Sequence, residues 1–267
     1  MPTWKGLPAA PDRDLLATLP KREQRGSRPR CILLTNGSDQ DVADRLSALA
    51  APFATVDSKY DRWMPRGFDD PSEAKLGDAF SLLSSEHREA VTCWWLAVRE
   101  HANTPNWEIA STTTIHGTKG LLLVEAKAHA AEMKTDGKAN KGRVENHTRI
   151  EEACREASAA LNSILPGWAL SVERSYQLCN RFAWAWKLAA LGVPVVLVYL
   201  GFLRAEEMRD QGLPLADADQ WEHLVRGHSR GVAPSTIWDE PIYVNGTPLR
   251  AIIHSLETPL DGAFLEE

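Results

Sequence analysis

The apolar positions of the chain follow two spacings, and the first of these predicts β-strands. Residues 107–115 and 121–129 are rich in Thr, Ile, Leu and Val, and the turn-forming residues 116–119 separate them. Residues 193–199 are apolar without a break, which is typical of a strand that is covered on both faces. Asn245 and Gly246 are typical of a tight turn between two short strands. The predicted strands are residues 31–35, 107–115, 121–129, 193–199, 242–244 and 249–254.

The second spacing, with apolar residues three or four positions apart, predicts helices between these strands. Ser84 or Ser85 can cap a helix that continues to about residue 101, because a serine side chain accepts hydrogen bonds from the first free backbone N–H groups. Residues 90–98 are apolar on nearly every side, so this helix is expected to be buried. The predicted helices are residues 41–49, 84–101, 144–163, 175–191 and 219–225.

These elements predict an α/β protein with one main domain and additions at both ends. We interpret residues 1–30, rich in Pro, Arg and Lys, as an irregular basic arm and residues 31–80 as an N-terminal βα addition. Residues 81–204 are the expected core, in which helices alternate with strands. Residues 205–267 are expected to pack on that core as a C-terminal addition.

Composition narrows the classes of protein to which the chain can belong. Its 43% apolar and 25% charged residues are typical of a globular protein. The longest apolar run, residues 193–203, is far shorter than the ~20 residues that a membrane-spanning helix needs, and the N-terminus lacks the layout of a secretory signal. We therefore expect no membrane contact and a cytoplasmic location. The four cysteines are scattered, which predicts free thiols.

The net charge of −6 argues against a protein that coats nucleic acid, since Lys and Arg are needed to neutralise phosphates. Two basic stretches, residues 21–30 and 134–149, could still supply a local binding groove. Taken alone, each stretch is more simply explained as a solvated surface.

Three charged side chains fall on the predicted hairpin. A four-residue turn at 116–119 would place Glu108 opposite Lys127, and Glu125 shares a face with Lys127 because side chains alternate along a strand. Burying two carboxylates in so apolar a setting is costly unless a cation compensates their charge. Mg²⁺, or Mn²⁺ in its place, could bind Glu108, Glu125 and the carbonyl of Ala126. The metal would lower the pKa of a water that Lys127 orients or helps to deprotonate, which is the chemistry of phosphodiester hydrolysis.

Residues 105–108, Pro-Asn-Trp-Glu, and residues 124–127, Val-Glu-Ala-Lys, together resemble the signature of the PD-(D/E)xK nuclease superfamily. The resemblance covers roughly residues 84–202. It implies a restriction-endonuclease-like core, with a mixed central sheet flanked by helices, and a divalent-metal-dependent nuclease that acts on nucleic acid, chiefly DNA. Many enzymes of this kind act as dimers, so a homodimer is also expected.

Asn106 stands where the family most often has an aspartate, and alternatives follow from this. If Glu108 supplies the first metal carboxylate, the catalytic set is complete. If Asn106 is the true equivalent, the site lacks a carboxylate, and the chain would be an inactive nuclease-fold protein that binds nucleic acid or has a regulatory role. A third interpretation is a purely structural sheet with an ion pair between Glu108 and Lys127.

Polar residues of the helix 175–191 are predicted to support the site. Gln177 and Arg181 share one face of this helix, and Asn180 lies beside that face. The resemblance implies that Gln177 contacts the active-site carboxylates or the attacking water. The planar guanidinium of Arg181 suits a phosphate.

Two further residues could assist. His129 follows Lys127 on the same strand face, and Glu100 lies near the end of the helix 84–101. The chain contains a second Glu-x-Lys at residues 73–75, which we discount because no apolar strand precedes it.

Overall fold

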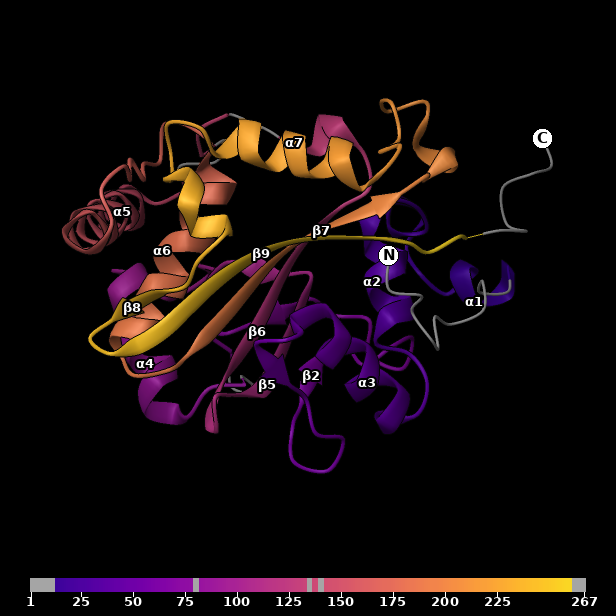
Figure 1. The fold of residues 1–267 in the computed structure, drawn as a ribbon, viewed down its shortest axis with the longest axis horizontal. Helices are drawn as coiled ribbons and strands as arrows, with labels where there is room; N and C mark the ends of the chain where they lie inside the picture. The colour runs from indigo at the N-terminus through magenta and orange to yellow at the C-terminus, as the bar shows by residue number, and fades with distance from the viewer. Residues whose placement is uncertain (1–12, 79–81, 134–135, 139–141, 261–267) are drawn as a thin grey trace.

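A mixed, curled sheet forms the centre of the protein in the computed structural model, which describes residues 13–78, 82–133, 136–138 and 142–260 (Figure 1). The strands run in the order β1-β5-β6-β7-β9-β8, and β2 also pairs with β5. β5 and β6 are antiparallel, whereas β6, β7 and β9 are parallel to one another. A separate ladder joins β3 (Ala74–Lys75) to β4 (Asn106–Trp107). The strands of the main sheet are β1 (Ala54–Thr55), β2 (Trp63–Met64), β5 (Ile109–Ile115), β6 (Thr118–Lys127), β7 (Val195–Leu203), β8 (Ile242–Val244) and β9 (Thr247–Glu257).

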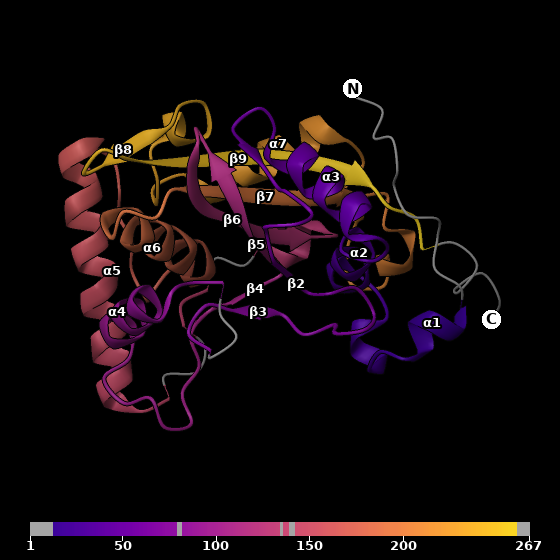
Figure 2. The same cartoon turned by 90° about the horizontal axis from the view of Figure 1, so that it is seen from below.

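Helices cover both faces of this sheet (Figure 2). One face carries α4 (Ser85–Trp95), α5 (Val144–Ile164), α6 (Tyr176–Ala190) and α7 (Ala218–Ser229). The other face carries α2 (Ser27–Leu34) and α3 (Asp39–Ala50). The short helical segments are α1 (Arg13–Ala17) and the 3₁₀ turns Lys21–Glu23, Ala130–Glu132, Glu206–Met208 and Ser235–Trp238.

Strand β7 supplies both cores of the protein. Val195 and Leu197 pack under α4, α5 and α6, while Val196 and Val198 pack under α2 and α3. Because side chains alternate along a strand, a strand covered on both faces must be apolar throughout. The prediction of such a strand is confirmed, as is the α/β class with helices on both sides of a mixed sheet.

The predicted strand at residues 31–35 is wrong, because these residues belong to the end of α2. The helix begins at Ser27, inside the segment predicted to be an irregular arm, and Arg30 on it is 1% exposed. The Arg30 guanidinium donates hydrogen bonds to the carbonyls of Gly26 and Thr258 and to Glu207. A short apolar run does not by itself distinguish a buried helix from a strand.

The hairpin of β5 and β6 has a tighter turn than predicted. Ile115 pairs with Thr118, so the turn contains only His116 and Gly117, both with positive φ, as the favoured two-residue hairpin turns require. The register shifts by two residues from the predicted one, and the ladder ends at the pair of Ile109 and Val124, so Glu108 lies just outside it and is not paired with Lys127. A shift of two leaves the side chains of the paired residues on their predicted faces.

Tryptophan side chains anchor α6 against α4. The ring centroids of Trp95 and Trp184 lie 5.8 Å apart, and those of Trp94 and Trp186 lie 6.0 Å apart. All four side chains are buried, as predicted for these two helices. Helix α4 ends at Trp95, earlier than the predicted residue 101. The packing fixes the face of α6 that carries the polar residues discussed below.

Gly201 on β7 lies against the indole ring of Trp221 on α7. A Cβ atom at residue 201 would be 2.6 Å from that ring, which is too close for unbonded atoms. We expect Gly201→Ala to lower the free energy of unfolding by roughly 1–3 kcal/mol, as overpacking does, when measured by urea denaturation. Gly227→Ala on α7 is the control, since no atom lies within 4 Å of its added Cβ. Equal effects of the two changes would contradict this close packing.

No helix within the described ranges has the length and apolar character needed to cross a membrane.

Candidate functional site

A buried carboxylate held between two cations lies at the end of β6. Glu125 is 1% exposed, and its Oε1 accepts a hydrogen bond from Lys127 Nζ at 2.5 Å. Its Oε2 accepts a hydrogen bond from Arg181 Nε at 2.6 Å. Burial alone would raise the pKa of Glu125, but Arg181 and Lys127 outweigh burial and hold this pKa below its ordinary value. Glu125 is therefore ionised at neutral pH.

Helix α6 positions Arg181 for this contact. The Arg181 Nη1 donates a hydrogen bond to Asn180 Oδ1 at 2.8 Å, and the guanidinium carbon lies 4.5 Å from the centroid of the Trp107 ring. Arg181 is only 6% exposed. Arg181 was predicted to bind a phosphate, and its partner in the structure is a carboxylate of the protein itself, Glu125.

Glu108 lies between β4 and β5 and has an unusual electrostatic environment. Burial, then the nearby charges of Glu125 and Glu73, raise its pKa to about 8. Its buried Oε2 has no hydrogen-bond partner among the described residues, and the closest cation is Arg28, whose Nη1 is 3.8 Å away. The predicted ion pair between Glu108 and Lys127 is not formed, because Lys127 pairs with Glu125.

Glu73 is a member of this acidic group that the sequence interpretation discounted. The β3–β4 ladder pairs Lys75 with Asn106, and Asn106 Nδ2 donates a hydrogen bond to Glu73 Oε2 at 2.6 Å. The Glu-x-Lys motif at residues 73–75 could therefore have identified Glu73 as a residue of the site. It was set aside because no apolar strand precedes it, yet the short ladder brings it to the site.

Arg28 is the second residue that the sequence interpretation missed. It is on α2, its side chain is 12% exposed, and it lies 3.8 Å from both Glu23 and Glu108. Its Nη2 also donates to the carbonyl of Pro71. No local pattern distinguishes it from the other arginines of residues 21–30, because only tertiary packing brings it to Glu108.

Other predicted residues fall in different places. Gln177 lines the pocket described below, as do Asn180 and Arg181. His129 instead pairs with Glu132 at 3.1 Å and does not line this pocket, although Glu132 does. Glu100 has a 73% exposed side chain near Arg143 and His101, away from the buried carboxylates.

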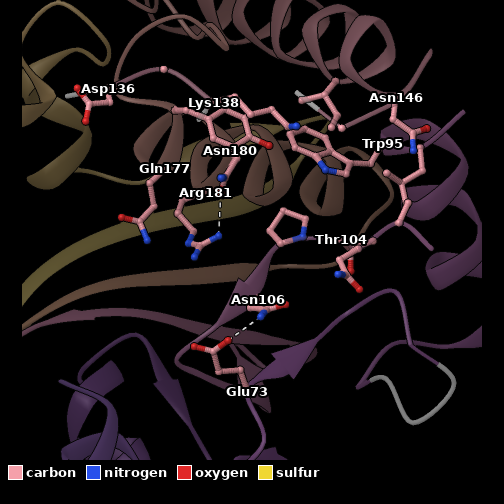
Figure 3. A pocket seen from close by; sticks show the side chains of 18 of the residues that line it. Glu73, Trp95, Thr104, Asn106, Asp136, Lys138, Asn146, Gln177, Asn180 and Arg181 are labelled. Carbon is pink, nitrogen blue, oxygen red and sulfur yellow. Dashed lines mark hydrogen bonds between the residues drawn. The ribbon is translucent and has the colours of Figure 1, made fainter. Parts of the chain in front are cut away.

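A pocket of about 900 Å³ opens beside the cluster. Figure 3 shows Gln177, Asn180 and Arg181 of α6 on one side of it and the hydrogen-bonded pair of Glu73 and Asn106 on the other. Glu108 and Lys127 also line this pocket, so three of the four predicted catalytic residues, Glu108, Lys127 and Gln177, face a shared space. Glu125 is covered by the two cations that it binds.

The chemistry of these side chains suits a divalent cation. The pKa of Glu108 is raised by its burial first and then by the charges of Glu125 and Glu73, and its Oε2 has no hydrogen-bond partner among the described residues, so a carboxylate oxygen of the kind that divalent cations bind is available here. Among the described residues, however, no three His, Cys, Asp or Glu side chains converge as a ready-made metal site. Both oxygens of Glu125 are bound by cations, so metal binding there requires Lys127 or Arg181 to move.

Comparison of the chain with models of protein families, with curated proteins and with solved structures finds no match. The site is therefore interpreted from its own geometry.

Proposed function

We propose that this protein is a divalent-metal-dependent nuclease that hydrolyses phosphodiester bonds, most of all in DNA. The observation that carries the proposal is the pairing of Glu125 with Lys127 at the buried end of β6, with Glu108, between β4 and β5, close enough for both charges to shift its pKa. Such a concentration of charge in a sheet core is costly and is typical of functional sites. A purely structural role would be served more stably by apolar side chains.

The order of elements supports a restriction-endonuclease-like core for residues 84–202. Helix α4 is followed by the β5–β6 hairpin, then by α5 and α6, and then by β7, which is parallel to β6. This is the helix, strand pair, helix and buried strand that the resemblance implies. The site residues lie on the hairpin and on α6, as in the proposed nuclease arrangement.

The residues present suggest distinct roles. Glu108, Glu125 and the Ala126 carbonyl would hold Mg²⁺ or Mn²⁺, which neutralises phosphate charge and lowers the pKa of a bound water. Burial would lower the pKa of Lys127, but Glu125 outweighs it and raises the pKa above its ordinary value. Lys127 is therefore an ammonium that donates hydrogen bonds to a water or phosphate oxygen, not a base. Arg181, once displaced from Glu125, would bind a phosphate through its planar guanidinium.

We expect Mg²⁺- or Mn²⁺-dependent cleavage of plasmid or single-stranded DNA, and a loss of at least about 100-fold in Lys127→Ala, since one positioned donor contributes about this much or more. Gel electrophoresis of the products measures the rate. Lys119→Ala is the matched control: Lys119 is on the same strand, is also paired with a carboxylate, Asp61 at 2.8 Å, and lies at the far end from the site. If the wild type cleaves none of these substrates, the proposed nuclease activity is contradicted. If Lys127→Ala cleaves as fast as the wild type, the proposed site is contradicted.

The second candidate is a nuclease-fold protein without catalysis, which binds nucleic acid or regulates a partner. It is favoured by the two cations that occupy both oxygens of Glu125 and by Asn106, whose amide is bound to Glu73. Binding of nucleic acid without cleavage in either metal would identify it. The homodimer and the cytoplasmic location stay predictions.

A further inference from the structure

The pocket beside the cluster has the size of a small-ligand site, and this bears on the substrate. Its volume of about 900 Å³ is within the range of ~300–1,000 Å³ that is typical of pockets for compact ligands. A base of a continuous double helix is stacked and paired, so it cannot enter such a pocket without leaving the helix. An unpaired nucleotide can instead enter a pocket, as enzymes that act on extruded bases demonstrate.

The wall formed by α6 has groups that suit one nucleotide. Arg181 lies at the carboxylate cluster, and Tyr176 lies five residues earlier, which corresponds to about 7.5 Å along the helix. Tyr176 is half-buried and lines the pocket, so part of its ring is available for stacking on a base.

Gln177 adds a group that can recognise a base or sugar. Its side chain points from α6 into the pocket (Figure 3), and its amide makes no hydrogen bond with any described residue. The pocket amides of Asn106, Asn146 and Asn180 are, in contrast, bound to Glu73, to the backbone of Val98 and to Arg181. An amide offers both a donor and an acceptor, which suits a base edge that is free of its pairing partner.

A positive charge also lines the pocket at the start of α5. Arg143 lines the pocket, its side chain is 46% exposed, and its nearest acidic partner, Glu100, is 3.9 Å away. A phosphate one step along the strand from the base could bind there, since exposed arginines commonly contact the nucleic-acid backbone.

We infer that this pocket binds an unpaired nucleotide adjacent to the scissile phosphate, so that the substrate is single-stranded nucleic acid or an unpaired end, not a continuous duplex. Tyr176 stacks on the base, Gln177 contacts its edge, and Arg143 binds a flanking phosphate. The inference rests on the proposed function, from which it takes nucleic acid as the ligand.

The test is fluorescence anisotropy of the full chain with labelled 12-nucleotide single strands of DNA or RNA and with the same DNA strand in a blunt duplex. Measurements in EDTA exclude cleavage. We expect the single strand to bind at least about tenfold more tightly than the duplex. Tyr176→Ala should weaken single-strand binding roughly five- to a hundredfold, as loss of a stacking aromatic does, and Tyr176→Phe should restore it.

Tyr243→Ala is the matched control, because Tyr243 is a 56% exposed tyrosine on β8 that does not line this pocket. Arg143→Ala is a second variant at an exposed position. It should make the fall of the logarithm of the binding constant with the logarithm of the salt concentration less steep, by the amount of about one phosphate contact. Circular dichroism and thermal unfolding establish that each variant is folded.

Equal affinity for duplex and single strand, no binding of either, or no effect of Tyr176→Ala and Arg143→Ala would overturn the inference. Single-strand binding that depends on Tyr176, without cleavage in any metal, would support it while rejecting the nuclease. Metal-dependent cutting of internal duplex sites with no preference for single strands would reject it while supporting the nuclease. Comparison of the DNA and RNA single strands shows which of the two nucleic acids the pocket prefers.

Discussion

Replacing Glu125 by alanine is expected to lower the free energy of unfolding by about 3–5 kcal/mol, the typical result of removing one member of a buried charge cluster. The change leaves two cations, Lys127 and Arg181, in the protein interior without their shared carboxylate. Among the described residues, no other opposite charge then lies at hydrogen-bond distance to compensate their desolvation. Urea denaturation followed by tryptophan fluorescence measures the effect.

Two comparisons make this prediction specific. Arg209→Ala removes one member of an ion pair with Glu206 in which both side chains are more than half exposed, and it should cost less than about 1 kcal/mol, as for most surface ion pairs. The combined change Glu125→Leu, Lys127→Met and Arg181→Met should recover much of the lost stability, because a buried charge cluster can often be replaced by apolar groups. A loss below about 1 kcal/mol in Glu125→Ala would show that Glu125 is not held between two buried cations.

This stability effect also determines how the cleavage experiment is designed. A Glu125→Ala protein could be inactive because it is unfolded, whereas Lys127→Ala leaves Glu125 paired with Arg181. Lys127→Ala is therefore the cleaner test of catalysis. Activity of any Glu125 variant has to be referred to the fraction of protein that is folded.

The sequence predicted the elements whose apolar pattern is decisive. β7 is apolar at every position, and α6 combines an apolar body with a polar face, so both were predicted, α6 to within one residue at each end and β7 with its end four residues too early. Glu125 and Lys127 were placed correctly on one strand face, because alternation does not depend on the length of the turn. The β5–β6 register was wrong by two residues, since the four turn-forming residues do not reveal that Thr118 and Lys119 join the strand.

What could not be predicted depends on contacts between distant parts of the chain. Arg28 reaches Glu108 only because α2 packs against the sheet, and Glu73 reaches Asn106 only through a two-residue ladder. Neither segment has a periodic pattern that specifies its position. The predicted partner of Glu108 was wrong for the same reason: the charges available to it come from three separate segments.

Glu108 should make the protein less stable as the pH rises. Its ordinary pKa of 4.5 applies to the unfolded chain, and the folded protein raises it to about 8. Below pH 4.5 both states are protonated, so there is no effect. Between pH 4.5 and 8 the unfolded chain loses this proton and the folded protein keeps it, which favours unfolding; above pH 8 the penalty is complete. Glu108→Gln should therefore be more stable than the wild type by up to about 5 kcal/mol at pH 8, and nearly equal at pH 4.5.

Urea denaturation of both proteins at several pH values measures this difference, with Glu240→Gln, a change at an exposed position, as the control. A difference between the wild type and Glu108→Gln that does not grow with pH would contradict the raised pKa. If the nuclease proposal is correct, Mn²⁺ binds the ionised form of Glu108, because metal ligands must be deprotonated. Mn²⁺ should then raise the melting temperature of the wild type more at pH 8 than at pH 6, and should have a smaller effect on Glu108→Gln at both. A stability difference that grows with pH, without any effect of Mn²⁺, would support the raised pKa of Glu108 and contradict its role as a metal ligand.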